Sequence, residues 1–284
     1  MTFSIVAWDP TPDAGPEWGV AVASKFLAVG SAVPWVEAGA GGIATQALAN
    51  LGYGPRGLEL LRAGRTAQHV VSELTGADED RDHRQLGAVD SRGGAATYTG
   101  AECLDWAGGR TGDGYCCQGN ILTGPDVVDR MVEAFEPSTG ELAYRLLAAI
   151  EAGDAAGGDR RGRQSAALYV AREGGGYGGT IDRSIDLRVD DHVTPIPELR
   201  RLLDFHRLLI PRPEDLDFVP VDDDLANRLR SRLASKGYDP GSGDGYDERL
   251  RRALYDFVGT ENLEERWTDE AKIDLGILEY LERS

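Results

Sequence analysis

The order of the predicted strands and helices constrains the fold of this chain more than any other feature. Predicted strands cover residues 3–8, 18–24, 32–37, 42–46, 85–90, 95–99, 165–171 and 185–189. Predicted helices begin at Gly54 and after a Thr66 cap, and continue over residues 127–135, 142–152 and 196–209. An order of strands, helices, strands, helices and strands favours two sheets packed face to face between helical layers over strict βαβ alternation.

A boundary is expected at the proline-rich segment 211–214, which precedes the acidic run Asp222-Asp223-Asp224. Beyond it, leucines and a phenylalanine recur at helical spacing: Leu225, Leu229, Leu233, Leu250, Leu254 and Phe257. The sequence therefore predicts a large α+β domain over residues 1–210 and a small helical domain over residues 211–284.

The charge balance limits the classes of partner. The formal net charge is −18 and no basic block is present, which argues against nucleic acid. No stretch reaches the ~20 apolar residues of a membrane span, and no signal peptide begins the sequence, so we expect a cytoplasmic protein away from membranes. The excess of acid over lysine suits a halophilic source, although a GC-rich genome also favours arginine over lysine.

Thr2 directly precedes the first predicted strand, and a small second residue usually allows the initiator methionine to be trimmed. The chain then begins with a residue that carries both a hydroxyl and an α-amine. A free α-amine titrates near pH 8, so it can act as the base for its own hydroxyl. Thr2 is therefore a candidate nucleophile. The alternative is that many proteins begin Met-Thr without any chemical role.

Lys25 supports the first interpretation. It lies within the apolar run 19–30, in a chain that has three lysines and 27 arginines. Burying an ammonium is costly without a partner, and arginine cannot replace a compact ammonium beside a nucleophile. The alternative is a lysine at a strand end whose ammonium extends to water.

The large domain resembles the DUF1028 family, which is grouped with the N-terminal-nucleophile (Ntn) hydrolase-like proteins. The resemblance lies in these segments: 2–7, 19–24, 28–30, 33–35, 44–46, Asn50, 53–54, 57–58, 82–85, 119–120, 156–167 and 188–192. It implies an αββα four-layer sandwich. The tail resembles the peptidoglycan-binding-like module often joined to this family, through Gly237-Tyr238, Asp244-Gly245 and Ala253-Leu254-x-x-Phe257.

The resemblance implies amide hydrolysis through an acyl-enzyme formed on Thr2. Lys25 resembles the proteasome-type lysine that keeps the terminal amine neutral, although it follows the nucleophile more closely than in that pattern. Asp9 or Asp159 could pair with Lys25, and Asp159 is favoured because it lies in a polar glycine-rich loop. Asn120 is a candidate oxyanion donor together with the backbone amides of 39–42, or else a cap for the following helix.

Two further groups could bind substrate. Thr45, Gln46 and Asn50 form a polar cluster at a strand end that could hold amide groups, or could only satisfy backbone groups in a turn. The loop 158–164 contains three arginines, and we expect Arg160 and Gln164 to contact a ligand carboxylate or phosphate. The alternative is that these arginines pair with the chain's own acids.

No metal or other cofactor is expected, because Asp190-Asp191-His192 and His83 show no ligand spacing. Cys103, Cys116 and Cys117 are interpreted as reduced thiols without a catalytic role.

Three hypotheses follow. The chain is an Ntn-type amidohydrolase of a small amide or peptide-like ligand, a silent scaffold that binds a small ligand or assembles partners (a homo-oligomer included), or a wall-associated binding protein. The tail is expected to dock or dimerise before it binds glycan.

Overall fold

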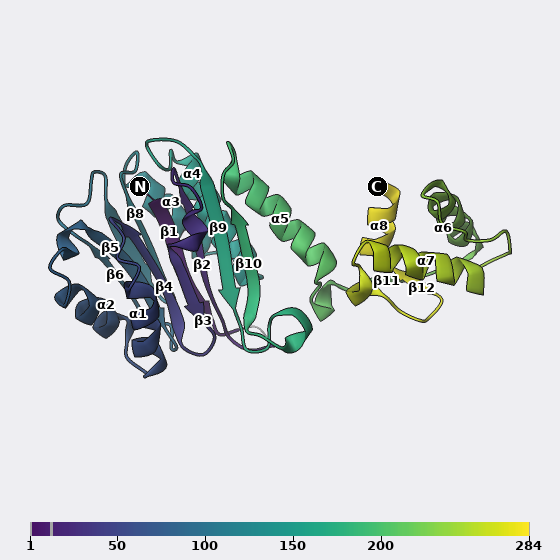
Figure 1. Cartoon of the computed structure of the whole chain (residues 1–284), viewed down its shortest axis with the longest axis horizontal. Helices are drawn as coiled ribbons and strands as arrows, with labels where there is room; N and C mark the ends of the chain where they lie inside the picture. The colour runs from purple at the N-terminus through teal and green to yellow at the C-terminus, as the bar shows by residue number, and fades with distance from the viewer. Residues whose placement is uncertain (1, 12–13, 284) are drawn as a thin grey trace. The chain divides into compact units, whose positions relative to one another are not determined.

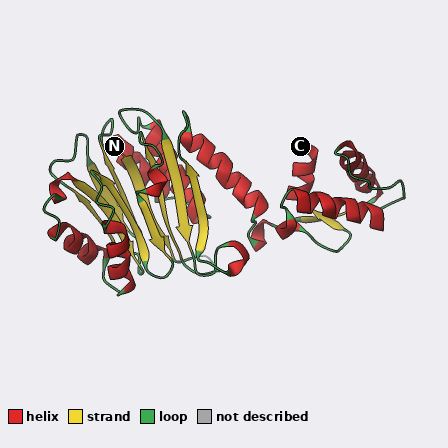
Figure 2. Cartoon of the chain, viewed as in Figure 1, coloured by secondary structure: helices red, strands yellow, loops and turns green. Residues whose placement is uncertain are grey.

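The computed structural model describes residues 2–11 and 14–283. The chain divides into two compact units, the first ending at Arg201 and the second beginning at Leu202. Helix α5 (Pro195–Leu209) spans this division, so the predicted boundary after residue 210 lies at its far end. Figure 1 labels the elements along the chain, and Figure 2 shows strands at the centre of the first unit with helices outside them.

The larger sheet of the first unit is antiparallel and has the strand order β10-β9-β2-β1-β8-β7. Its strands are β1 (Thr2–Asp9), β2 (Glu17–Ser24), β7 (Gly108–Gly112), β8 (Tyr115–Asn120), β9 (Ser165–Ala171) and β10 (Arg183–Val189). The central strand β1 is buried along almost its whole length. Its first residue, Thr2, lies opposite Asn120 of β8.

The smaller sheet is also antiparallel and follows the order β3-β4-β5-β6. Its strands are β3 (Pro34–Glu37), β4 (Gly41–Ala47), β5 (Arg84–Asp90) and β6 (Ala95–Thr99). Apolar side chains from both sheets meet in one core: Val6, Trp18, Val20, Val22, Val36, Ala44, Val89, Cys116, Ala167 and Ala171. The two sheets therefore pack against each other through one face each.

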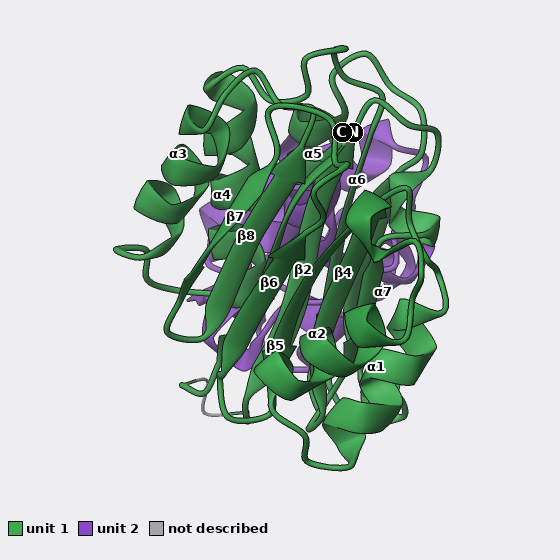
Figure 3. Cartoon of the chain, turned by 90° about the vertical axis from the view of Figure 1, so that its left-hand side faces the viewer, with its two compact units in different colours: residues 1–201 green, residues 202–284 purple. Residues whose placement is uncertain are grey.

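Helices cover the other face of each sheet, on opposite sides of the strands in Figure 3. Helices α1 (Tyr53–Arg62) and α2 (Ala67–Gly76) pack on the smaller sheet, where Ile43, Leu61 and Leu86 share a core. Helices α3 (Asp126–Phe135) and α4 (Leu142–Ala155) pack on the larger sheet. The predicted cap of α2 is confirmed, because the Thr66 hydroxyl accepts a hydrogen bond from the His69 backbone N–H.

Two strands differ from the sequence prediction. No strand was predicted between residues 99 and 165, but β7 and β8 form a hairpin over residues 108–120 at one edge of the larger sheet. β7 has three glycines in five residues, and β8 buries Gln118 and Asn120. Neither strand shows the apolar alternation that usually identifies one.

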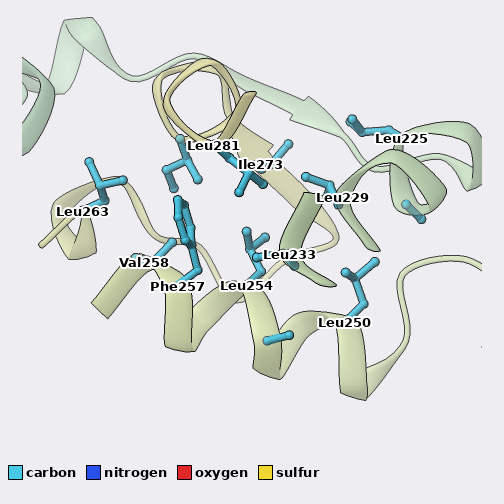
Figure 4. Close-up of a cluster of buried hydrophobic side chains, with 13 residues drawn as sticks. Leu225, Leu229, Leu233, Leu250, Leu254, Phe257, Val258, Leu263, Ile273 and Leu281 are labelled. Carbon is cyan, nitrogen blue, oxygen red and sulfur yellow. The ribbon is translucent and has the colours of Figure 1, made fainter. Parts of the chain in front are cut away.

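The second unit contains helices α6 (Asp223–Ser235), α7 (Glu248–Thr260) and α8 (Leu275–Arg283). It also contains a short antiparallel pair, β11 (Phe218–Pro220) with β12 (Lys272–Asp274). The leucine-spaced faces of α6 and α7 meet α8 in one apolar core, which Figure 4 shows around Phe257. Buried Arg266 forms an ion pair with Asp274 at 2.8 Å. The chain is thus a mixed α/β protein with antiparallel sheets and a C-terminal helical region.

Candidate functional site

Polar side chains fill one end of the space between the two sheets. Alternate residues of a strand point to the same side of the sheet. The side chains that point between the sheets are apolar in the core, and they become polar toward the end where β1 begins at Thr2. We call this group the polar layer: Thr2, Ser4, Ser24, Gln46, Gln85, Gln118 and Asn120, all buried. Burying so many polar groups is costly unless they satisfy one another, so their hydrogen bonds decide the local geometry.

Gln85 is the centre of the polar layer. Its amide nitrogen donates to the backbone oxygens of Gly119 at 2.7 Å and Gly108 at 3.3 Å, and to the Thr99 hydroxyl at 2.9 Å. Its amide oxygen accepts from Gln46 Nε2 at 2.8 Å and from Asn120 Nδ2 at 2.9 Å. One side chain therefore links strands of both sheets, and a connected network of this kind holds each member in one orientation.

Ser4 and Gln118 extend the network along β1 and β8. The Ser4 hydroxyl donates to Gln46 Oε1 at 2.7 Å and accepts from Gln118 Nε2 at 2.7 Å. Gln118 Oε1 is buried and has no hydrogen-bond partner among the described residues. This amide lies against Gly87, where an added Cβ would stand 2.1 Å from Gln118 Oε1. Glycine at position 87 is therefore what allows Gln118 to lie between the sheets.

Thr2 ends the polar layer. Its side chain is 5% exposed, and its hydroxyl lies 3.1 Å from the hydroxyl of Ser24 on β2. The Thr2 carbonyl oxygen accepts a hydrogen bond from Gln46 Nε2 at 3.4 Å. The structure thus brings three predicted site residues together, Thr2, Gln46 and Asn120. The Asn120 amide belongs to the network and does not cap α3, which begins without a side-chain cap.

Ser24 contacts the Thr2 hydroxyl and was not among the residues predicted from the sequence. It occupies the last position of β2, directly before Lys25. The sequence feature that could have identified Ser24 is a hydroxyl residue at the end of a strand otherwise rich in valine and alanine. Ser24 is two positions from Val22, which places both side chains on the same face of the strand. The register of β1 against β2 brings it to the Thr2 hydroxyl.

Lys25 and Asp159 contact each other in a different way from the expected ion pair. Asp159 is buried, and its carboxylate accepts the Lys25 backbone N–H at 2.8 Å. The Lys25 side chain is exposed, and its ammonium donates to the Arg163 carbonyl at 3.3 Å. The ion pair of Asp159 is with Arg161, at 3.3 Å. The favoured ion pair between Lys25 and Asp159 is therefore wrong, and the alternative of a lysine at a strand end whose ammonium extends to water describes this residue.

The predicted cluster of Thr45, Gln46 and Asn50 is divided by strand alternation. Thr45 faces away from the polar layer, and its hydroxyl donates to the Asn50 carbonyl at 3.1 Å. Asn50 Nδ2 donates to Asp78 at 3.0 Å, as does Arg84 Nε at the same distance. The Arg84 guanidinium holds the pKa of the Asp78 carboxyl well below its usual range. Thr45 and Asn50 thus organise the loop after β4.

Two of the three loop arginines pair with acids of the chain. Arg161 pairs with Asp159, and Arg163 Nε donates to Asp154 at 2.7 Å. Arg160 is exposed and forms no ion pair within the described residues. Its backbone N–H donates to the Ile121 carbonyl at 3.2 Å. Ile121 follows Asn120, so Arg160 is anchored next to the strand end opposite Thr2.

Gln164 closes the loop beside Ser24. Its backbone N–H donates to the Ser24 carbonyl at 3.1 Å, and its side chain donates to Asp191 at 3.1 Å. A cavity of about 10 Å³ lies nearby, lined by residues that include Phe3, Ser24, Asp159 and Arg163. A space of this size holds about one water molecule.

Exposed apolar side chains occur in the loops at this end of the sandwich: Phe26, Leu27, Leu48, Leu51 and Leu104. The first two follow β2, the next two follow β4, and Leu104 precedes β7. The Leu104 carbonyl accepts the Ile121 backbone N–H at 2.9 Å, which anchors it beside the end of β8. These side chains are available for contact with another molecule at this end of the domain.

The two cysteines of β8 offer no competing nucleophile. Cys116 and Cys117 are buried in β8, and burial raises the pKa of the Cys116 thiol to about 12. A thiol so far from ionisation is not reactive at neutral pH. Within residues 2–11 and 14–283, no group of three or more His, Cys, Asp or Glu side chains has an arrangement able to hold a metal ion. None of the helices there combines the length and the apolar character needed to cross a membrane.

Comparison with known proteins gave the following matches. The family model described as "Family of unknown function (DUF1028)" matches residues 2–199, and the one described as "Putative peptidoglycan binding domain" matches residues 209–281. A crystal structure of a protein from Silicibacter pomeroyi, assigned to DUF1028, shares 35% sequence identity with a TM-score of 0.66. That match covers 72% of this chain and 86% of the other. None of the curated proteins matches the chain.

Proposed function

The chain belongs to the DUF1028 family, and we propose that it hydrolyses a small amide or peptide-like substrate with the Thr2 hydroxyl as nucleophile. The observation that carries this proposal is the position of that hydroxyl, 3.1 Å from Ser24 Oγ at the first residue of the central strand. In a chain that begins at Thr2, the α-amine can take the hydroxyl proton as the oxygen attacks the carbonyl.

The layer arrangement supports the same proposal. Helices lie outside both sheets, and the sheets face each other through one core. We assign this arrangement to the αββα sandwich of Ntn-hydrolase-like proteins. In such a site a free N-terminal residue must be held firmly, because attack requires the reacting atoms to be aligned. The hydrogen bond from Gln46 to the Thr2 carbonyl and the strand pairs on both sides of β1 supply that support.

The neighbouring groups have distinct roles in this mechanism. The Ser24 hydroxyl relays the proton between the Thr2 hydroxyl and the α-amine. One N–H of the Asn120 amide donates to Gln85 Oε1, and its second N–H can donate to the oxyanion. The Lys25 ammonium is exposed and donates to the Arg163 carbonyl, so this mechanism does not depend on its charge.

The surroundings of Thr2 favour a substrate with both apolar and anionic parts. The loops at this end expose Phe26, Leu27 and Leu104, which would cover an apolar acyl group. Arg160 forms no ion pair with a described residue in a chain of net charge −18, so it is available for a carboxylate. N-acyl amino acids combine these two features.

Four proteins test the proposal: a chain released from a cleavable leader so that Thr2 is first, the same chain retaining Met1, and the Thr2→Ala and Ser24→Ala variants of the first. Release of amine from a panel of N-acyl amino acids is measured. We expect turnover only when Thr2 is first, a loss of about a thousandfold or more in Thr2→Ala, and a smaller loss of about a hundredfold in Ser24→Ala. Equal turnover with Met1 retained would exclude Thr2 as nucleophile.

One observation favours a second candidate function, a silent scaffold that binds a ligand or assembles partners. Thr2 is only 5% exposed, and the cavity beside Ser24 holds about one water molecule. If no amide is cleaved by any form while the exposed apolar loops bind a partner, the scaffold replaces the enzyme. Replacing Phe26 and Leu104 with serine distinguishes the two, because a scaffold, which cleaves no amide, loses its partner, whereas the enzyme loses turnover of substrates with an apolar acyl group.

A further inference from the structure

We propose that a pocket at the opposite end of β1 from Thr2 binds a free α-amino acid. The pocket has a volume of about 340 Å³ and is lined by Trp8, Asp9, Pro10, Thr11, Asp113, Gly114, Ser138, Thr139, Gly140 and Arg145. We call it the Asp9 pocket. Thr2 and Asp9 are seven residues apart on a strand, which places them roughly 23 Å from each other. The pocket is therefore separate from the proposed catalytic site and does not depend on it.

Arg145 of α4 supplies a group that can bind a carboxylate. Its Nη1 donates to Asp9 Oδ2 at 2.7 Å, its Nε donates to Ser138 Oγ at 3.2 Å, and its guanidinium lies 4.7 Å from the Phe135 ring centre. A guanidinium has five N–H donors, so these two bonds leave three available. The side chain is held on three sides yet remains 17% exposed. The edge formed by Nη1 and Nη2 can therefore bind both oxygens of a carboxylate.

Trp8 supplies a second donor. Its indole Nε1 is buried and has no hydrogen-bond partner among the described residues. Leaving a buried donor unpaired costs about 1–3 kcal/mol. Because Nε1 itself is closed to solvent, a ligand oxygen recovers that free energy only when the indole turns toward the pocket. The indole also offers a flat apolar surface beside the polar groups, as small-molecule sites commonly do.

Asp113 supplies the complementary charge for an ammonium. It lies in the turn between β7 and β8, is exposed, and forms no ion pair with any residue that the structure describes. Asp9 adds a second carboxylate, whose Oδ1 accepts two hydrogen bonds from Thr11, at 2.9 and 2.6 Å. The pocket thus combines unused donors on Arg145 and Trp8 with an unused acceptor on Asp113.

The balance of charge in the pocket selects the ligand class. Two carboxylates repel a simple anion, while a simple cation leaves the donors of Arg145 and Trp8 without an acceptor. A zwitterion meets both needs, with its carboxylate on Arg145 and Trp8 and its ammonium on Asp113. A free α-amino acid is the smallest molecule with that pattern, and the volume of the pocket accommodates one.

The indole N–H resonance of Trp8 tests the proposal in the full chain. The resonance is assigned by its loss from the ¹⁵N spectrum of Trp8→Phe and is then followed during titration with L-alanine, with sodium propionate and with propylamine hydrochloride. We expect a saturable shift with alanine, and binding at least about tenfold weaker for each single-charge analogue. No shift with alanine up to ~50 mM, a weak limit for small-ligand binding, would overturn the proposal. Propionate binding as tightly as alanine would overturn it too.

A matched pair of variants locates the ammonium. Asp113→Asn removes the exposed carboxylate of the pocket, and Glu79→Gln makes the same charge change at an exposed position outside it. We expect alanine to bind about tenfold more weakly to Asp113→Asn, with unchanged melting temperature, and normally to Glu79→Gln. Equal binding by both variants would contradict the assignment of Asp113.

Discussion

Gly87 shows how a single residue controls the polar layer. Its missing side chain leaves room for the Gln118 amide, which donates to Ser4 and lies between the sheets. Any Cβ at position 87 would stand 2.1 Å from Gln118 Oε1, so the amide would have to leave Ser4. The backbone at Gly87 is ordinary strand, so the requirement comes from the neighbouring side chain and not from the dihedral angles.

Gly87→Ala should therefore lower the free energy of unfolding by about 2–3 kcal/mol, because it overpacks the core and breaks buried hydrogen bonds. Gly76→Ala is the control: a Cβ at the end of α2 meets no atom within 4 Å, and alanine favours a helix. Urea unfolding measures both. A Gly87→Ala variant as stable as the control would show that Gln118 can reorient freely.

At the scale of elements, the sequence was sufficient for most strands and helices and insufficient for the hairpin that completes the site. β1 and β2 carry strong apolar patterns, and Thr66 is a recognisable cap, so these were predicted. β8 was missed because its inward positions are Gln118 and Asn120, whose partners come from β1 and β5. A polar residue in a strand can be recognised as buried only when its hydrogen-bond partners are known.

The candidate site shows the same limit. Thr2, Gln46 and Asn120 were named from the sequence and do converge. The predicted ion pair between Lys25 and Asp159 was wrong because the Asp159 carboxylate accepts the backbone N–H of Lys25. That contact depends on the geometry of the loop. Ser24 was missed because only the strand register brings it to Thr2.

Gln85→Leu tests the role of β5 in joining the sheets. The change removes a side chain that accepts from Gln46 and Asn120 and donates to Gly119, leaving buried groups unpaired. We expect a loss of about 2–4 kcal/mol in the free energy of unfolding. Thr99→Val removes only one acceptor of the same amide and should cost about 1 kcal/mol. Equal losses in the two variants would show that Gln85 is not the centre of the network.

At the scale of the whole molecule, stability depends on pH through a histidine of the second unit. Burial, with a smaller effect of Arg207, lowers the pKa of His206 from 6.5 to about 4. Between these values the unfolded chain binds a proton that the folded chain does not, so stability falls as the pH is lowered from 6.5 toward 4. By pH 5 the loss is about 1–2 kcal/mol.

His206→Gln removes this titration. We expect the variant to lose about 1–2 kcal/mol less than the parent between pH 7 and pH 5, measured by urea unfolding of the full chain. Parallel pH profiles for the two proteins would show that His206 titrates normally in the folded state. The carboxylates shared by both proteins contribute equally and cancel in the comparison.

The central claim is that the Thr2 hydroxyl is a nucleophile when its own amine is free. The most direct measurement is to treat the chain that begins at Thr2 with an acylating β-lactone and to locate the adduct by peptide mass spectrometry. We expect one ester on the Thr2 hydroxyl, absent when Met1 is retained and strongly reduced in Ser24→Ala. An adduct of equal yield with Met1 in place, or labelling only at other residues, would contradict it.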